Sequence, residues 1–309
     1  MKNQRHNCIS ASFSLLSVHF DDLRGVGAAG TRTPVCDRVR SMSDFVRNTV
    51  NTCPVDLIVL HGIRPNSYEE LRSSIPSFEP AALPPMPVER EAKSQDSSEA
   101  LFQSRFGAAT ADRIEADGAM APSPQGNDMA AFLQRSDSFW HASGVADAVP
   151  LHVELSPRNS AAGPTSFRSL RVSAPDFRLP PSTDGADRVS LERYFGACRQ
   201  LGVDVAVGHL HLQSREVTGG GYRDALLDSI TAGGTAADAD TRSFVGETND
   251  YFSNARVASN RFHRCVYRRR ERNTLRPVAL STMPVFESGT SGREATSLRP
   301  ILVRFDVDV

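Results

Sequence analysis

The stretch VDLIVLHG, residues 55–62, decides the fold class. Its first six residues, 55–60, are apolar except for Asp56 and are rich in valine, isoleucine and leucine, which is typical of a buried strand. A strand that is apolar on both faces is expected beneath flanking helices, as in α/β proteins. In open α/β sheets, ligands bind at the carboxyl ends of such strands. Here the strand is followed by His61 and Gly62, so these two residues are the first candidates for a site.

Strands and helices are predicted on both sides of this stretch. Residues 12–20 read as a strand. A helix opens at Pro34 and ends at Cys53-Pro54, because apolar residues recur there at three- and four-residue steps. The later elements are a short helix over 66–75 capped by Asn66 or Ser67, strands over 129–139 and 150–155, helices over 190–202 and 222–233, and strands over 203–214, 242–250, 261–270 and 299–309. This mixed order predicts a layered α/β sandwich.

Composition restricts the classes of protein to consider. No apolar run of the 309-residue chain approaches the ~20 residues that span a bilayer, so no transmembrane segment is expected. Five cysteines without a CxxC pair favour a reducing, intracellular compartment over a disulfide framework. The N-terminus is basic up to Asp21, which leaves a mitochondrial presequence open. A net charge of −1 gives no electrostatic argument for nucleic-acid binding by the whole chain.

Two stretches interrupt the regular pattern. Residues 76–125 and 156–187 are rich in proline and serine, and we expect both to be irregular or disordered insertions. Residues 1–11 form an N-terminal extension. We therefore predict a single domain over 12–309 that carries two insertions.

The order of the predicted segments resembles that of the endonuclease/exonuclease/phosphatase superfamily, which has the DNase I-like fold. The resemblance covers nearly the whole chain apart from the two insertions. It implies a four-layer α/β sandwich, in which two packed mixed β-sheets are flanked by helices. It also implies a metal-dependent phosphoester hydrolase site at the strand ends.

The first motifs of the superfamily are altered in this sequence. The opening strand of the family ends in asparagine, and His19 takes that position. The next strand ends in Gln-Glu, with the glutamate as the principal magnesium ligand, and here the pair is His61-Gly62. A later strand ends in Thr-His-Leu, which GHLHL at 208–212 resembles, with His211 as the candidate catalytic histidine.

The last motifs are partly kept. The family's Gly-Asp-x-Asn corresponds to GETN at 246–249, so the resemblance assigns vestigial catalytic roles to Glu247 and Asn249. The next strand places His263 near the position of a family aspartate. The final Ser-Asp-His is replaced by Ser297-Leu298-Arg299, which lacks the imidazole that polarises the phosphate.

Two interpretations of the strand-end histidines stay open. Together with Glu247, His19 and His61 offer a ligand set that suits zinc better than magnesium. Alternatively, they are half-buried polar residues without a ligand. The resemblance implies Mg²⁺ or Mn²⁺ if the protein is active, and otherwise we expect no cofactor.

We therefore predict a catalytically degenerate member of this superfamily that acts as a binding or assembly component. Its expected partner is a protein or an RNA–protein assembly, because the charge is near neutral. The alternative is a divergent, active metal-dependent phosphodiesterase that acts on nucleic acid, phosphoinositides or sphingolipids. A third interpretation is an unrelated α/β domain.

Overall fold

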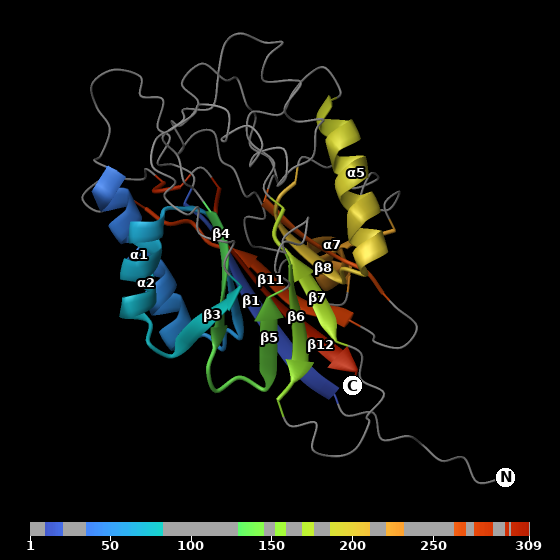
Figure 1. Cartoon of the computed structure of the whole chain (residues 1–309), viewed down its shortest axis with the longest axis horizontal. Coiled ribbons are helices and arrows are strands. Elements are labelled where there is room, and N and C mark those ends of the chain that lie inside the picture. Colours follow the sequence, from blue (N-terminus) through green and yellow to red (C-terminus); the bar gives the residue numbers. More distant parts are fainter. Residues whose placement is uncertain are drawn as a thin grey trace, which may run out of the picture.

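Two six-stranded β-sheets form the centre of the computed structural model (Figure 1). The structure describes residues 10–20, 35–82, 129–144, 152–158, 169–175, 186–210, 221–231, 263–269, 275–286, 294–296 and 298–308. The first sheet has the order β11-β12-β1-β2-β4-β3, with β1 (Ser10–His19), β2 (Leu57–Ile63), β3 (Phe78–Ala82), β4 (Met129–Arg135), β11 (Leu275–Thr282) and β12 (Ile301–Asp308). The second has the order β5-β6-β7-β8-β10-β9, with β5 (Trp140–Gly144), β6 (His152–Pro157), β7 (Leu170–Ser173), β8 (Val205–His209), β9 (Arg223–Asp224) and β10 (His263–Tyr267).

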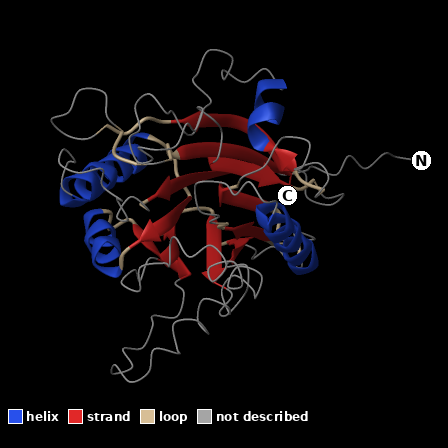
Figure 2. Cartoon of the chain, turned by 90° about the horizontal axis from the view of Figure 1, so that it is seen from above, coloured by secondary structure: helices blue, strands red, loops and turns tan. Residues whose placement is uncertain are grey.

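Helices cover the outer faces of the sheets, as Figures 1 and 2 show. The helices are α1 (Val35–Thr52), α2 (Pro65–Ser74), α5 (Ala186–Leu201) and α7 (Ala225–Thr231). Met42 of α1 and Leu71 of α2 belong to one buried cluster with Ile58 of β2. On the other side, Phe195 of α5 clusters with Val266 of β10. The predicted four-layer α/β sandwich is confirmed.

The inner faces of the two sheets share the main core. In the parallel pair β1 and β2, Leu15 lies beside Leu57 and Ser17 beside Val59. Leu15, Leu57 and Val59 belong to a buried cluster that also contains Val207 of the second sheet. Side chains alternate between the two faces of a strand. Ser17 and His19 of β1, and His61 of β2, therefore also face the second sheet.

Each predicted insertion contains a strand, so the expectation of irregular chain is wrong for part of both ranges. The range 76–125 contains β3, which pairs with β4 at the edge of the first sheet. The range 156–187 contains β7, which pairs with β6 and β8. Both strands are short, and Pro80 made β3 read as a loop although proline is tolerated in an edge strand. Residues 83–128, 159–168 and 176–185 lie outside the described part of the chain.

Two helix predictions also need correction. Helix α2 is capped at Arg64 without a side-chain hydrogen bond, and not at Asn66 or Ser67. Pro65 provides the start instead, because its fixed backbone angle suits the first helical position. The helix predicted over 222–233 is α7, which begins after the short strand β9. The strand predicted over 242–250 lies outside the described residues.

Candidate functional site

Four buried histidines meet where the inner faces of the two sheets end. The parallel register of β1 and β2 places His19 beside His61. The antiparallel register of β8 and β10 places His209 beside His263. All four side chains are at most 2% exposed. Each sheet therefore contributes one pair of histidines from neighbouring strands.

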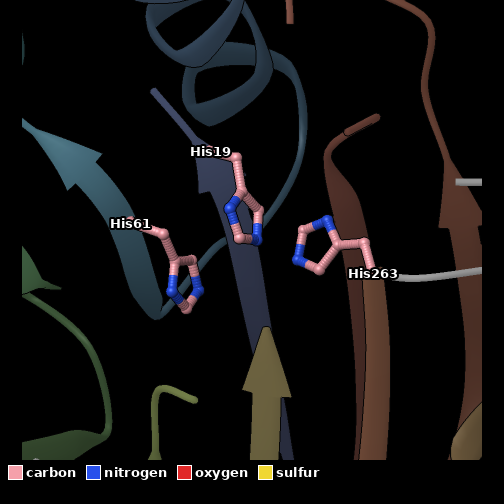
Figure 3. A group of neighbouring side chains, drawn as sticks. All are labelled: His19, His61 and His263. Carbon is pink, nitrogen blue, oxygen red and sulfur yellow. The ribbon is translucent and has the colours of Figure 1, made fainter. Parts of the chain in front are cut away.

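Three of the rings are in direct contact (Figure 3). The rings of His19 and His61 stack with centroids 4.3 Å apart and planes 8° from parallel. The ring of His263 meets that of His19 edge-on, at 4.5 Å and 88°. The His209 ring is also edge-on to His19, at 5.9 Å. His19 is thus the central member of the cluster.

A hydroxyl group joins two of the imidazoles and fixes their tautomers. Nδ1 of His263 lies 2.8 Å from the carbonyl oxygen of Arg299 and must donate to it, because a carbonyl only accepts. In the neutral ring, Nε2 of His263 then accepts from the Ser17 hydroxyl, at 2.8 Å. The same Ser17 oxygen lies 3.0 Å from Nε2 of His61, which donates to it. The Nδ1 atom of His61 is left as an acceptor.

Three imidazoles of the cluster, those of His19, His61 and His263, are held in the neutral form. Burial holds the pKa of His19 well below the usual 6.5, and the adjacent imidazoles of His61, His263 and His209 lower it further. Burial, followed by the neighbouring His263, likewise lowers the pKa of His61. Burial lowers the pKa of His263 to about 4, although its hydrogen bond to the Arg299 carbonyl acts in the opposite direction. Neutral imidazole is the form that binds metal ions.

The donor set does not fit magnesium. His19, His61 and His263 each offer a ring nitrogen, and these nitrogens lie within 4.8 Å of one another. Magnesium prefers oxygen ligands and uses one or two carboxylates. Among the described residues, the ligand-type side chains gathered at this place are the three histidines, without a carboxylate. The Mg²⁺ that the fold family implies is therefore not matched by the residues described here.

The backbone conformation at Gly62 also argues against a magnesium ligand in β2. Its φ of 63° lies in the left-handed region, and the register between β2 and β4 shifts between Leu60 and Ile63. A residue in this conformation inside a strand marks a β-bulge, for which glycine is preferred. The position that the resemblance assigns to the glutamate ligand is thus a glycine-specific kink.

The segment before β12, of which residues 294–296 and 298–300 are described, contacts the histidine cluster. The guanidinium of Arg299 forms a buried ion pair with Glu294, at 2.7 Å. The hydroxyl of Thr296 donates to the carbonyl oxygen of His19 at 3.1 Å. Together with the Arg299 carbonyl on His263, these contacts tie the segment to both sheets. The ion pair engages Arg299, to which the resemblance assigns the position of the family's phosphate-polarising histidine.

The structure brings together two of the residues selected from the sequence. His19 and His61 are stacked, as the convergence of strand ends predicted. The other candidates, His211, Glu247 and Asn249, lie outside the described residues. The roles assigned to those three residues remain predictions.

Sequence reasoning missed Ser17, and it matched His209 and His263 to family motifs without assigning either of them a site role. One signal was available in the sequence. Ser17 and His19 are two residues apart in β1, so their side chains lie on the same face of the strand. His263 starts β10 and His209 ends β8, which places them at one end of an antiparallel pair. This pairing register cannot be read from the local sequence.

No helix in the described part of the chain combines the length and hydrophobicity that a membrane crossing requires. No protein-family model and no curated protein matches the sequence.

Solved structures provide the comparisons. The chain is similar to D. rerio TDP2 complexed with single strand DNA product, with 12% identity, a TM-score of 0.57, and 96% of this chain and 99% of that chain covered. It is also similar to an endonuclease/exonuclease/phosphatase family protein from Bacteroides thetaiotaomicron, with 12% identity, a TM-score of 0.53, and coverage of 97% and 100%. A third similar structure is the mannosyl-6-phosphatase Bt3783 of the same species, with 9% identity, a TM-score of 0.51, and coverage of 95% and 99%. The chain has the DNase I-like fold of the endonuclease/exonuclease/phosphatase superfamily.

Proposed function

We propose that the chain is a catalytically degenerate protein of the DNase I-like fold, and that it acts as a binding or assembly component. One observation carries this proposal. The strand-end position expected to provide the glutamate ligand is the left-handed Gly62, and the residue before it is the buried His61. Without a carboxylate there, Mg²⁺ would lose its main anchor and with it the polarisation of the phosphoryl oxygen.

The replacement of the final motif supports the proposal independently. Arg299 carries a positive charge but is paired with Glu294 in a buried contact. A guanidinium held in this way is not available to stabilise charge on a phosphate in the transition state. The fold itself is unaffected, because these changes lie at strand ends and in a loop.

A protein, or an RNA–protein assembly, is the partner that the charge favours. The net charge of −1 gives no field to attract a polyanion to the chain as a whole. Retention of the fold without its ligands is consistent with a surface kept for contacts. The fold on its own does not specify which partner is bound.

The test is a hydrolysis assay on the purified chain with Mg²⁺, Mn²⁺ or Zn²⁺. The substrates are single- and double-stranded nucleic acid and phosphoinositides. We expect no metal-dependent turnover above a protein-free blank. Metal-dependent turnover that Glu247→Ala abolishes would contradict the proposal, and His141→Ala, in an exposed position of β5, is the matched control.

A divergent, active phosphodiesterase is the second candidate, and two of the similar structures support it. The similar TDP2 was crystallised with single strand DNA product, and another similar structure is a mannosyl-6-phosphatase. A phosphodiester ligand therefore suits the fold. In this case Glu247, Asn249 and His211 would supply the catalytic groups, with Mg²⁺ or Mn²⁺ as the cofactor. The same assay separates the two candidates.

A further inference from the structure

We infer that His19, His61 and His263 form a binding site for a late first-row transition-metal ion of the zinc class. The inference goes beyond the proposed function, since a metal site of this kind needs no hydrolytic activity. It rests on three imidazoles whose ligand atoms lie within 4.8 Å of one another and which are all buried.

Buried ring nitrogens without hydrogen-bond partners support a metal site at these histidines. Among the described residues, neither ring nitrogen of His19 has a hydrogen-bond partner, nor has Nδ1 of His61, and these atoms are inaccessible to solvent. Buried polar atoms without partners are rare and need an explanation. A metal ion that accepts a lone pair from His19 would provide one.

The hydrogen bond that orients the His263 ring is of the kind found in metal-ligating histidines. Metal-ligating histidines usually donate the proton of the other ring nitrogen to a carbonyl or carboxylate, which orients the ring. In His263 the Arg299 carbonyl takes the Nδ1 proton at 2.8 Å. The lone pair of Nε2 is therefore the one available to a metal. In the structure it accepts the hydroxyl proton of Ser17, so metal uptake exchanges this hydrogen bond for a metal–nitrogen bond.

The distances require only a small contraction. In a tetrahedral site with Zn–N bonds of about 2.0–2.1 Å, two ligand nitrogens lie about 3.3–3.4 Å apart. The three nitrogens already lie within 4.8 Å. Rotation of the imidazoles by less than about 1 Å at the nitrogens brings them into the range of a tetrahedral ion. The stacked pair and the edge-on ring approach the centre from two sheets.

The chemistry of the donors selects the ion. Imidazole suits zinc, copper, nickel and cobalt, whereas magnesium and calcium require oxygen ligands. Three neutral ligands leave the ion's charge unbalanced in a buried site, which limits affinity. A zinc ion can reduce this charge by ionising a water in its fourth position.

The first test uses the wild-type chain, purified without a histidine tag and treated with a chelator. After incubation with Zn²⁺ and removal of unbound metal, we expect about one zinc per chain by elemental analysis. Incubation with Mg²⁺ should leave no stoichiometric metal. Co²⁺ should give the intense visible bands of a tetrahedral nitrogen site. Less than about 0.1 zinc per chain, or a weak octahedral cobalt spectrum, would overturn the inference.

Variants then assign the ligands. His19→Asn and His263→Asn should each lower zinc affinity by at least about tenfold. His141→Asn, which changes an exposed histidine of β5, should keep the wild-type value. Zinc binding of His19→Asn equal to that of the control would contradict the assignment. Should a variant not fold by circular dichroism, the cobalt spectrum of the wild-type chain decides alone.

Discussion

At the scale of single residues, Ser17 organises the cluster. Its hydroxyl donates to Nε2 of His263 and accepts from Nε2 of His61, so one oxygen atom pairs with a nitrogen of two buried imidazoles from different sheets. A serine that is fully buried in a strand is otherwise a cost, because its hydroxyl has lost its bonds to water. Here the strand places the hydroxyl between two nitrogens that need it.

Ser17→Ala should destabilise the metal-free protein by about 2–4 kcal/mol, because it leaves a buried donor on His61 and a buried acceptor on His263. Urea unfolding followed by circular dichroism measures the change. Ser143→Ala is the control, since the Ser143 hydroxyl is exposed and reaches a carbonyl only at 3.4 Å. We expect the control to stay within about 0.5 kcal/mol of wild type. Equal effects of the two substitutions would show that the bridge is unimportant.

At the scale of elements, β8 can approach its neighbours closely because it contains Gly208. A Cβ atom at this position would lie 2.0 Å from the carbonyl oxygen of Pro175 and 2.8 Å from Cε1 of His61. The next residue, His209, donates its backbone N–H to the same Pro175 carbonyl at 3.0 Å. The glycine therefore sets both the path of the chain after β7 and the space for the His61 ring.

Gly208→Ala should lower the free energy of unfolding by about 2 kcal/mol or more, because the added methyl group meets backbone that cannot move aside. It should also weaken zinc binding by displacing His61. Gly196→Ala in α5 is the matched control: its Cβ would meet only Arg199, at 4.0 Å, and alanine favours a helix. We expect the control to be neutral or stabilised by about 1 kcal/mol. Chemical denaturation and zinc titration of both variants make the comparison, and an unchanged Gly208→Ala protein would refute the steric argument.

At the scale of the whole molecule, the buried histidines make the free energy of unfolding depend on pH. His19 and His61 come from the first sheet and His263 from the second, and burial lowers the pKa of all three. Because the folded protein binds protons at these sites more weakly than the unfolded chain, acid favours unfolding.

The free energy of unfolding of the zinc-free protein should therefore fall as the pH is lowered from about 6.5, by about 1.4 kcal/mol per pH unit for each histidine that stays neutral when folded. The contribution of His263 is complete near its folded pKa of about 4. The described acidic residues with lowered pKa values act only below their ordinary values, which are 4.5 for Glu79 and Glu154 and 3.8 for Asp228. Urea unfolding at pH 7, 6 and 5 thus isolates the histidines.

His19→Asn should reduce this pH dependence by about one proton, whereas His141→Asn should not. A slope that is the same in His19→Asn and in wild type would contradict the burial of a neutral His19. The measurement uses chelator-treated protein, because bound zinc would compete with protons for the same nitrogens.

Much of the layer arrangement could be predicted from the sequence, because it depends on local patterns. The apolar stretch at 55–60 indicated a strand covered by helices, and it is one. The proximity of His19 and His61 was expected from two neighbouring strand ends, and their parallel register is a finding of the structure. The pairing of His209 with His263 could not be foreseen, since it depends on a register set between distant segments. Strands as short as β3 and β7 carry too few residues for a periodicity to emerge.

The left-handed backbone at Gly62 has a consequence for any attempt to install a carboxylate ligand in β2. Gly62→Glu is a single substitution, but a side chain at a φ of 63° costs about 1–2 kcal/mol and the bulge would aim it away from the regular strand position. A working ligand at this position would therefore require removal of the bulge as well as the substitution. For the engineering of metal chemistry in this protein, the three buried histidines are the nearer starting point.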